Sequence, residues 1–147
     1  MGATISGEAI VAPAAFPDTW IDGWLASAEA DRELRTIGRW TSFTLVLRSG
    51  DEEVVVDIDG GRPHRRTDAT TEAVDLEVIR LEGSPAAWDS MLVPCPAPRC
   101  NDVLALDRHH PEFSIAEGRT SLIRHLRILL LLLRIAAHTE GRVDAQH

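Results

Sequence analysis

The spacing of apolar residues changes several times along the chain, and each change marks a predicted element. Near the N-terminus apolar residues recur every three to five positions, and Pro17 and Asp18 supply helix-start signals. The pattern predicts an amphipathic helix with the apolar side chains Phe16, Trp20, Ile21, Trp24, Leu25 and Ala28. Residues 31–37, where acidic and basic residues alternate around Leu34, continue this helix or begin another.

After Gly38 the apolar period becomes two, which is the period of a half-buried strand. Apolar residues alternate over positions 43–47 and again over 54–58, with the turn residues Ser49-Gly50-Asp51 between them. This arrangement predicts a β-hairpin. The polar segment that follows, up to Thr71, is expected to be an exposed loop or a short edge strand.

The second half of the chain contains further strand and helix signals. A third strand is predicted from Val74 to Gly83, and Ser84 and Pro85 are suited to cap and begin a short helix that carries Trp88. Prolines at 94, 96 and 98 end that helix. The remaining predicted elements are a short helix capped by Asn101 or Asp102, a strand over 113–116 and one long helix over 120–138.

Hairpin-linked strands with grouped helices predict the fold class. An α+β domain is expected, with a mostly antiparallel sheet of four to five strands and the helices packed on one face. The 147 residues are the usual length of one domain. We place that domain at residues 14–138, with tails at 1–13 and 139–147.

The terminal helix is unusually rich in leucine, with the sequence RILLLLLRIAAH at positions 127–138. A membrane-spanning helix needs about 20 apolar residues, and this run is interrupted by Arg134. On one continuous helix, Arg124, Arg127, Arg134 and His138 form a narrow stripe, and the remaining arc is wider than one sheet buries. A second apolar neighbour is therefore expected: the first helix, a second copy of the protein in a homodimer, or a bound lipid.

The charge of the chain limits its partners. A net charge of −8 repels polyanions, so neither nucleic acid nor stable membrane anchoring is expected. The N-terminus has no basic region before its apolar stretch, which indicates a cytoplasmic protein rather than a secreted one.

Four polar residues are candidates for catalysis. Asp57 and Asp59 are two apart near a strand end, and Glu117 and His125 flank the start of the terminal helix. Each has a simpler interpretation as a strand-end, capping or border residue. Cys95 and Cys100 with the adjacent His109 and His110 lack the paired spacing of a zinc site, so no metal is expected. No phosphate loop or dinucleotide fingerprint occurs, and no cofactor is expected.

Three stretches carry a family resemblance: VDLEVIRLEGSPAAW, NDVLALDR and FSIAEG, the last followed by a Leu- and Arg-rich helix. Over residues 14–138 the pattern resembles the sterol carrier protein type 2-like domains, including bacterial versions. The resemblance implies an apolar tunnel, enclosed by sheet and helices, for a sterol, a fatty acyl chain or a polyketide-like molecule. The implied lining is Trp88, Met91, Leu92, Leu104, Leu106, Leu126, Leu129, Leu130 and Leu133.

Three functions remain open from the sequence. The first is a carrier that binds a small hydrophobic ligand without chemistry. The second is a cyclase or isomerase that uses the same pocket with acid–base groups from the four candidates above. The third is an interaction domain whose wide apolar helix packs against a partner chain.

Overall fold

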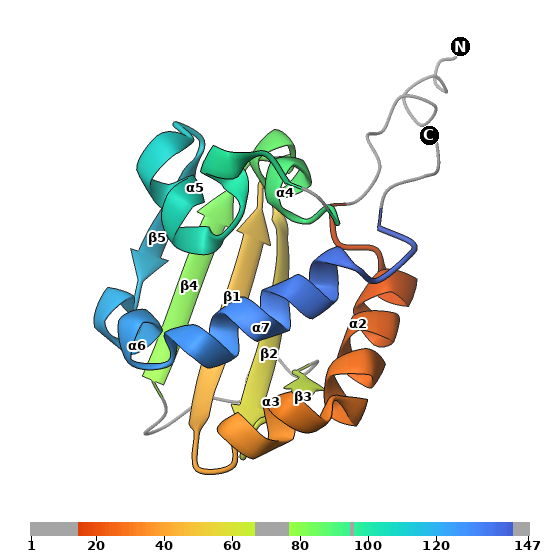
Figure 1. Cartoon of the computed structure of the whole chain (residues 1–147). Coiled ribbons are helices and arrows are strands. Elements are labelled where there is room, and N and C mark those ends of the chain that lie inside the picture. The colour runs from red at the N-terminus through yellow and green to blue at the C-terminus, as the bar shows by residue number, and fades with distance from the viewer. Residues whose placement is uncertain (1–14, 67–76, 95, 143–147) are drawn as a thin grey trace.

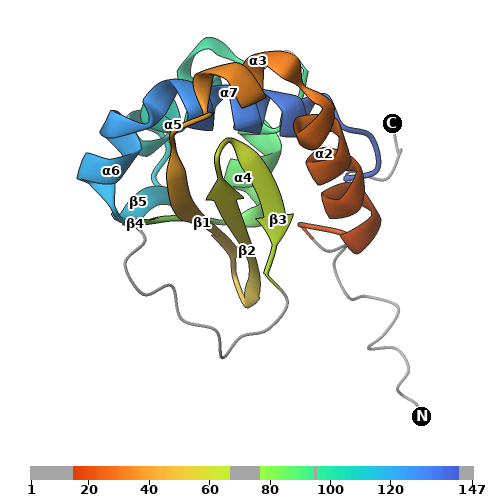
Figure 2. The same cartoon turned by 90° about the horizontal axis from the view of Figure 1, so that it is seen from below.

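Within the described residues, 15–66, 77–94 and 96–142 of this computed structural model, the helices lie on one face of a five-stranded sheet (Figures 1 and 2). The strands are β1 (Ser42–Ser49), β2 (Glu52–Asp59), β3 (Arg62–Arg65), β4 (Glu77–Gly83) and β5 (Phe113–Glu117). The helices are α2 (Asp18–Ala30), α3 (Arg32–Ile37), α4 (Pro85–Met91), α5 (Val103–His109), α6 (Arg119–Arg124) and α7 (Leu126–Ala137), with a 3-10 turn η1 (Pro98–Cys100).

The order across the sheet is β3-β2-β1-β4-β5. Strands β1 and β4 are parallel, and the other neighbours are antiparallel. The expected α+β class with a mostly antiparallel sheet is therefore confirmed.

The predicted hairpin is confirmed as β1 and β2. Phe43, Leu45 and Leu47 are completely buried, and each lies opposite an apolar residue of β2. Gly50 adopts a φ of 61° at the turn, a left-handed conformation that glycine reaches without strain. Strand β3 is the short edge strand that the polar segment allowed. The strand predicted from Val74 is described from Glu77 onward, and residues 74–76 lie outside the described part.

The predicted caps of the two short helices are also confirmed. The hydroxyl of Ser84 accepts a hydrogen bond from the Ala87 N–H at 3.1 Å, with Pro85 in the first turn. Asp102, rather than Asn101, caps α5 and accepts from the Ala105 N–H at 2.9 Å. The Ser84 cap fixes the start of α4, and the Asp102 cap fixes the start of α5, where the proline-containing segment ends.

The second neighbour of the terminal helix is the first helix. Trp20 and Trp24 of α2 are completely buried and stack on each other with ring centroids 5.2 Å apart. Their indole N–H groups donate to backbone carbonyls of α7, from Trp20 to Ala136 at 3.3 Å and from Trp24 to Leu132 at 3.0 Å. Helix α7 therefore packs beside α2 on the same face of the sheet, and α2 is the first of the three neighbours expected (Figure 2).

The prediction of one helix over residues 120–138 is wrong, because the chain breaks at His125 into α6 and α7. The backbone there (φ −109°, ψ 25°) leaves helical values. The imidazole is held by the sheet: it stacks on Phe43 with centroids 5.1 Å apart, and its Nε2 lies 3.0 Å from Oε1 of Glu77. These tertiary contacts override a sequence that favours continuous helix.

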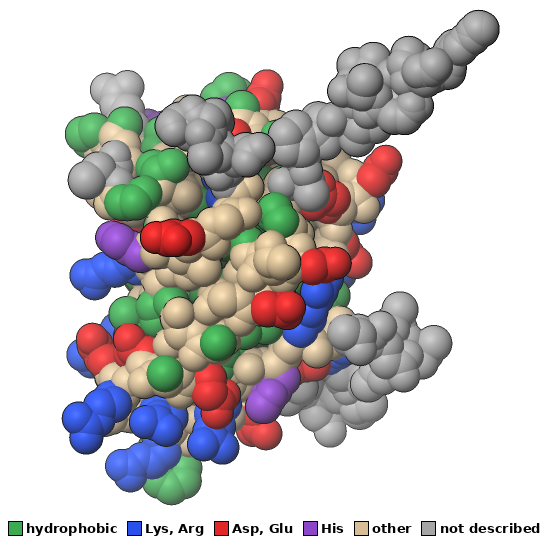
Figure 3. Space-filling view, turned by 90° about the vertical axis from the view of Figure 1, so that its right-hand side faces the viewer, with side chains coloured by type: hydrophobic (Ala, Val, Ile, Leu, Met, Phe, Trp, Pro, Cys, Tyr) green, Lys and Arg blue, Asp and Glu red, His purple; other side chains and the backbone are tan. Residues whose placement is uncertain are grey.

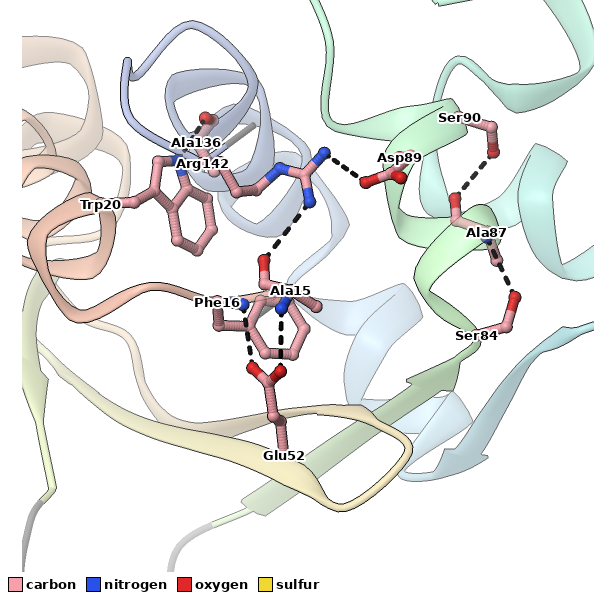
Figure 4. Close-up of polar contacts among 10 residues, drawn as sticks. All are labelled: Ala15, Phe16, Trp20, Glu52, Ser84, Ala87, Asp89, Ser90, Ala136 and Arg142. Carbon is pink, nitrogen blue, oxygen red and sulfur yellow. Dashed lines mark hydrogen bonds and ion pairs between the residues drawn. The ribbon is translucent and has the colours of Figure 1, made fainter. Parts of the chain in front are cut away.

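Polar contacts join the beginning and the end of the described chain (Figure 4). The Glu52 carboxylate accepts hydrogen bonds from the backbone N–H groups of Ala15 at 2.8 Å and Phe16 at 3.0 Å. Arg142, only 6% exposed, donates to the Ala15 carbonyl at 3.3 Å and to Asp89 of α4 at 2.7 Å. Part of the segment that the sequence assigned to a tail thus packs on the domain; the boundaries at 14 and 138 stay a prediction.

Candidate functional site

A groove of about 490 Å³ lies between α7 and the residues that follow α4. One wall is α7 itself, through Leu130, Leu131, Leu133 and Ala137. The other wall comes from the end of α4, the proline segment and the start of α5, through Met91, Val93, Pro94, Pro96 and Val103. Both walls are apolar, so the groove is suited to a hydrophobic ligand.

The proline segment explains why this side of α7 is not closed. Proline lacks a backbone N–H and disfavours helix at the residue before it, and the described residues 92–94, 96 and 97, between α4 and η1, accordingly form no helix. They therefore cannot supply a continuous helical ridge that would pack into α7. Leu130 and Leu131 remain partly exposed beside it, whereas Leu129 and Leu132 on the opposite face are completely buried.

Charged side chains line the rim of the groove. Arg127 and Arg134 come from α7 and His138 is its C-cap, whereas Glu33 comes from α3 and Asp102 is the N-cap of α5. Arg127 and Glu33 form a loose, well-exposed pair at 3.9 Å. Although the whole chain carries −8, basic side chains gather around the end of the molecule that holds α3, at the lower left of Figure 3.

The nine residues implied as ligand contacts fall into two groups, those that line the groove and those that pack in or against the core. Met91, Leu130 and Leu133 line the groove. The other six are packed in or against the core, where Trp88, Leu106 and Leu129 have no exposed surface. Trp88 also donates its indole N–H to the Arg48 carbonyl at 2.9 Å, so its polar atom is used in the fold. These remaining six are Trp88, Leu92, Leu104, Leu106, Leu126 and Leu129.

Asp57 and Asp59 lie next to each other on one face of β2, away from the groove. Asp57 accepts from the Thr44 hydroxyl at 2.8 Å and is paired with Arg66 at 2.6 Å. Burial raises the pKa of Asp57, but the hydrogen bonds from Arg66 and Thr44 and the neighbouring positive charges outweigh it and hold that pKa below its ordinary value. A carboxylate held ionised in this way is a structural anchor rather than a general acid.

Glu117 and His125 are not brought together. Glu117 pairs with Arg80 at 3.2 Å on the exposed side of the sheet, whereas His125 contacts Glu77. A hydrogen bond from Ser121 is the main cause that lowers the pKa of Glu77; burial opposes it, and His125 and Arg124 lower it further. None of the four catalytic candidates lines the groove.

The described residues contain no cluster of His, Cys, Asp and Glu that could hold a metal ion. Cys100 is a free thiol, and Cys95 lies outside the described part of the chain. His109 ends α5, and His110 is its C-cap, where His110 Nδ1 accepts from the Glu112 N–H at 3.1 Å. Among the helices of the described part, none is long and apolar enough to cross a membrane.

The fold is similar to that of sterol carrier protein 2. A crystal structure of that protein aligns with a TM-score of 0.63 over 86% of this chain and 99% of that chain, at 17% sequence identity. The sequence itself matches no protein-family model and no curated relative. The likeness therefore concerns the fold, which agrees with the resemblance seen in the sequence pattern.

Sequence reasoning missed most of this groove, since only Met91, Leu130 and Leu133 of its lining residues were among the implied ligand contacts. Its implied lining contained no residue of the proline segment and no charged residue. Two signals were present: three prolines between two capped helices, which predict an irregular wall, and arginines at 127 and 134 that bracket Leu130 and Leu131. Neither signal says on which side of the helix an opening lies.

Proposed function

We propose that the protein binds a small hydrophobic ligand in the groove between α7 and the proline segment and carries it without making or breaking bonds. The observation that carries this proposal is the groove itself, whose volume of about 490 Å³ lies within the ~300–1,000 Å³ usual for ligand sites. The fold that the chain shares with sterol carrier protein 2 supports the same class of function.

The energetics favour an apolar ligand. Each 100 Å² of apolar ligand surface removed from water contributes about 2.5 kcal/mol before the cost of association is subtracted. The walls present leucine, valine, methionine and proline side chains, so they can supply such contact without specific polar groups. A sterol, a fatty acyl chain or a polyketide-like molecule fits this description.

The enzymatic alternative has less support from the geometry. Asp57, Glu117 and His125 each contact another protein group, and all lie away from the groove. A cyclase or isomerase would need a proton-transfer group within hydrogen-bond reach of its substrate.

The proposal is tested by filling the groove. Leu131 is partly exposed on the groove wall, so Leu131→Trp can occupy the groove without entering the core. The control is Ile123→Trp, at a 53% exposed position of α6 that does not line the groove. Binding of the neutral fluorescent dye N-phenyl-1-naphthylamine is expected to be saturable in the natural protein and in the control.

The expected loss in Leu131→Trp is about tenfold or more in dye affinity. Native mass spectrometry of the freshly purified protein would identify a ligand that co-purifies. Equal dye binding in Leu131→Trp and Ile123→Trp, or no saturable binding to the natural protein, would overturn the proposal.

A further inference from the structure

Arg142, which follows the end of α7, is a buried arginine with a partner on another helix. Its side chain is 4% exposed, whereas that of its partner Asp89 on α4 is 58% exposed. Its Nη2 donates to Asp89 at 2.7 Å and its Nη1 to the Ala15 carbonyl at 3.3 Å, whereas Nε has no partner among the described residues (Figure 4). A buried guanidinium is unfavourable unless it is paired, so this side chain depends on Asp89.

The Arg142–Asp89 pair joins the two elements that carry the walls of the groove. On one side the lining continues through Ala137 to His138, the C-cap of α7, four residues before Arg142. On the other side Met91, which lines the groove, is two residues after Asp89 on α4. The ion pair thus completes a short path from one wall to the other.

The residues between α7 and Arg142 follow a defined course. The Thr139 hydroxyl donates to the Ile135 carbonyl at 2.7 Å, and the Thr139 N–H donates to the Ala136 carbonyl at 3.1 Å. Gly141 has a φ of 101°, a conformation that residues with side chains rarely adopt. Arg142 is therefore fixed relative to the end of α7, and its contact with Asp89 fixes α4 relative to the same helix.

Aromatic contacts hold α4 on other neighbours. The Trp88 ring packs edge-on against Phe16 and Phe113, with ring centroids 5.4 and 5.3 Å away. These contacts hold α4 against β5 and the segment before α2. The Arg142–Asp89 pair instead connects α4 to the end of α7, and the groove lies between α7 and the residues that follow α4.

We infer that the Arg142–Asp89 pair sets the separation of the groove walls and thereby the size of the ligand that the groove accepts. This inference rests on the proposed carrier function and adds a determinant of its specificity. Neither side chain lines the groove, so both are positioning residues that act through Met91 and the end of α7. When the pair is broken the walls can move apart, so a small ligand loses contact with one wall while a larger ligand gains room.

The experiment compares two uncharged dyes of different size, N-phenyl-1-naphthylamine and the bulkier Nile red, by fluorescence titration. Asp89→Asn removes the carboxylate charge at an exposed side chain. It is expected to weaken the smaller dye about three- to fivefold, the factor for a charge-assisted contact with one exposed partner, and to bind the larger dye as well as the natural protein or better. Asp89→Glu keeps the carboxylate and should preserve the natural ratio of the two affinities.

The matched control is Asp18→Asn. It breaks the ion pair of Asp18 with Arg65, 3.0 Å apart and outside the groove, and should change the affinity for neither dye. The ratio of the two affinities is the decisive quantity, because a loss of folded protein lowers the binding of both dyes alike. Thermal unfolding of Asp89→Asn and Asp18→Asn, within a few degrees of the natural protein, shows that both variants are folded.

The outcomes separate this inference from the carrier function. An unchanged ratio in Asp89→Asn, or the same shift in Asp89→Asn and Asp18→Asn, overturns the inference on ligand size and leaves the carrier function standing. If the natural protein binds only the smaller dye, Asp89→Asn must gain binding of Nile red, and the lack of that gain also overturns the inference. Absence of saturable binding of N-phenyl-1-naphthylamine to the natural protein overturns both.

Discussion

The two faces of α7 carry similar leucines but have different neighbours. On the inner face Leu129 and Leu132 are completely buried, and the Leu132 carbonyl accepts the indole N–H of Trp24. On the outer face Leu130 and Leu131 stay partly exposed beside the proline segment. Residue type alone therefore does not separate core from binding surface here; the regularity of the opposing element does.

The two faces of α7 differ in burial because the elements that pack against them differ in regularity. The sheet and α2 present regular rows of side chains that interdigitate with a helix. Among the described residues that follow α4, Val93, Pro94 and Pro96 belong to no helix or strand, and a groove lies between them and α7. The inner face should thus contribute mainly to stability and the outer face mainly to binding.

The largest expected effect on stability comes from truncating one leucine on each face of α7. Leu129→Ala is expected to lower the free energy of unfolding by about 2–5 kcal/mol, because it leaves a cavity in a closed core. Leu131→Ala should cost about 1 kcal/mol or less but weaken dye binding. Urea denaturation and the dye titration measure the two effects. A similar stability loss in both variants would show that the two faces are equivalent.

This comparison also shows what sequence reasoning can reach. The period change near Gly38, the hairpin turn at Gly50 and the caps at Ser84 and Asp102 are local signals, and the structure confirms them. The parallel pairing of β1 with β4 and the helix break at His125 depend on contacts between distant segments. Such contacts leave no periodic trace in the sequence.

The same limit applies to the groove. The wide apolar arc of the terminal helix indicated a second neighbour but did not decide among the first helix, a second copy of the protein and a bound lipid. The structure assigns one side to Trp20 and Trp24 and leaves Leu130 and Leu131 beside the groove. The candidate acids were identified by type and position, and their actual partners, such as Arg66 for Asp57, come from strand register and loop geometry.

A smaller loss of unfolding free energy is expected when the Glu77 carboxylate, which contacts His125 just before α7, is replaced. The Glu77 carboxylate fixes His125 at the helix break, and its lowered pKa means that folding favours the ionised form. Glu77→Gln should lower the free energy of unfolding at pH 7 by about 0.5–1.5 kcal/mol, a figure discounted for partial exposure.

The pH dependence gives the sign of this effect. A carboxyl whose pKa is lower in the folded state stabilises the protein above its unfolded value, near 4.5, and that stability is lost as pH falls through the folded pKa. The gap between the natural protein and Glu77→Gln in urea midpoints should therefore close between about pH 5 and pH 3. A gap that stays constant with pH would mean that the glutamate acts through its shape rather than its charge.

The smallest effect concerns the ion pair between Glu33 and Arg127 at the rim of the groove. Glu33→Gln removes an exposed ion pair, so the free energy of unfolding should change by less than about 0.5 kcal/mol. It also leaves Arg127 without its acidic partner at the rim of the groove. Binding of the neutral dye N-phenyl-1-naphthylamine should therefore stay within about twofold of the natural protein, because a neutral ligand gains little from the changed field. A loss of unfolding free energy well above about 0.5 kcal/mol in urea denaturation would mean that Glu33 holds α3 against α7 more strongly than an exposed ion pair does.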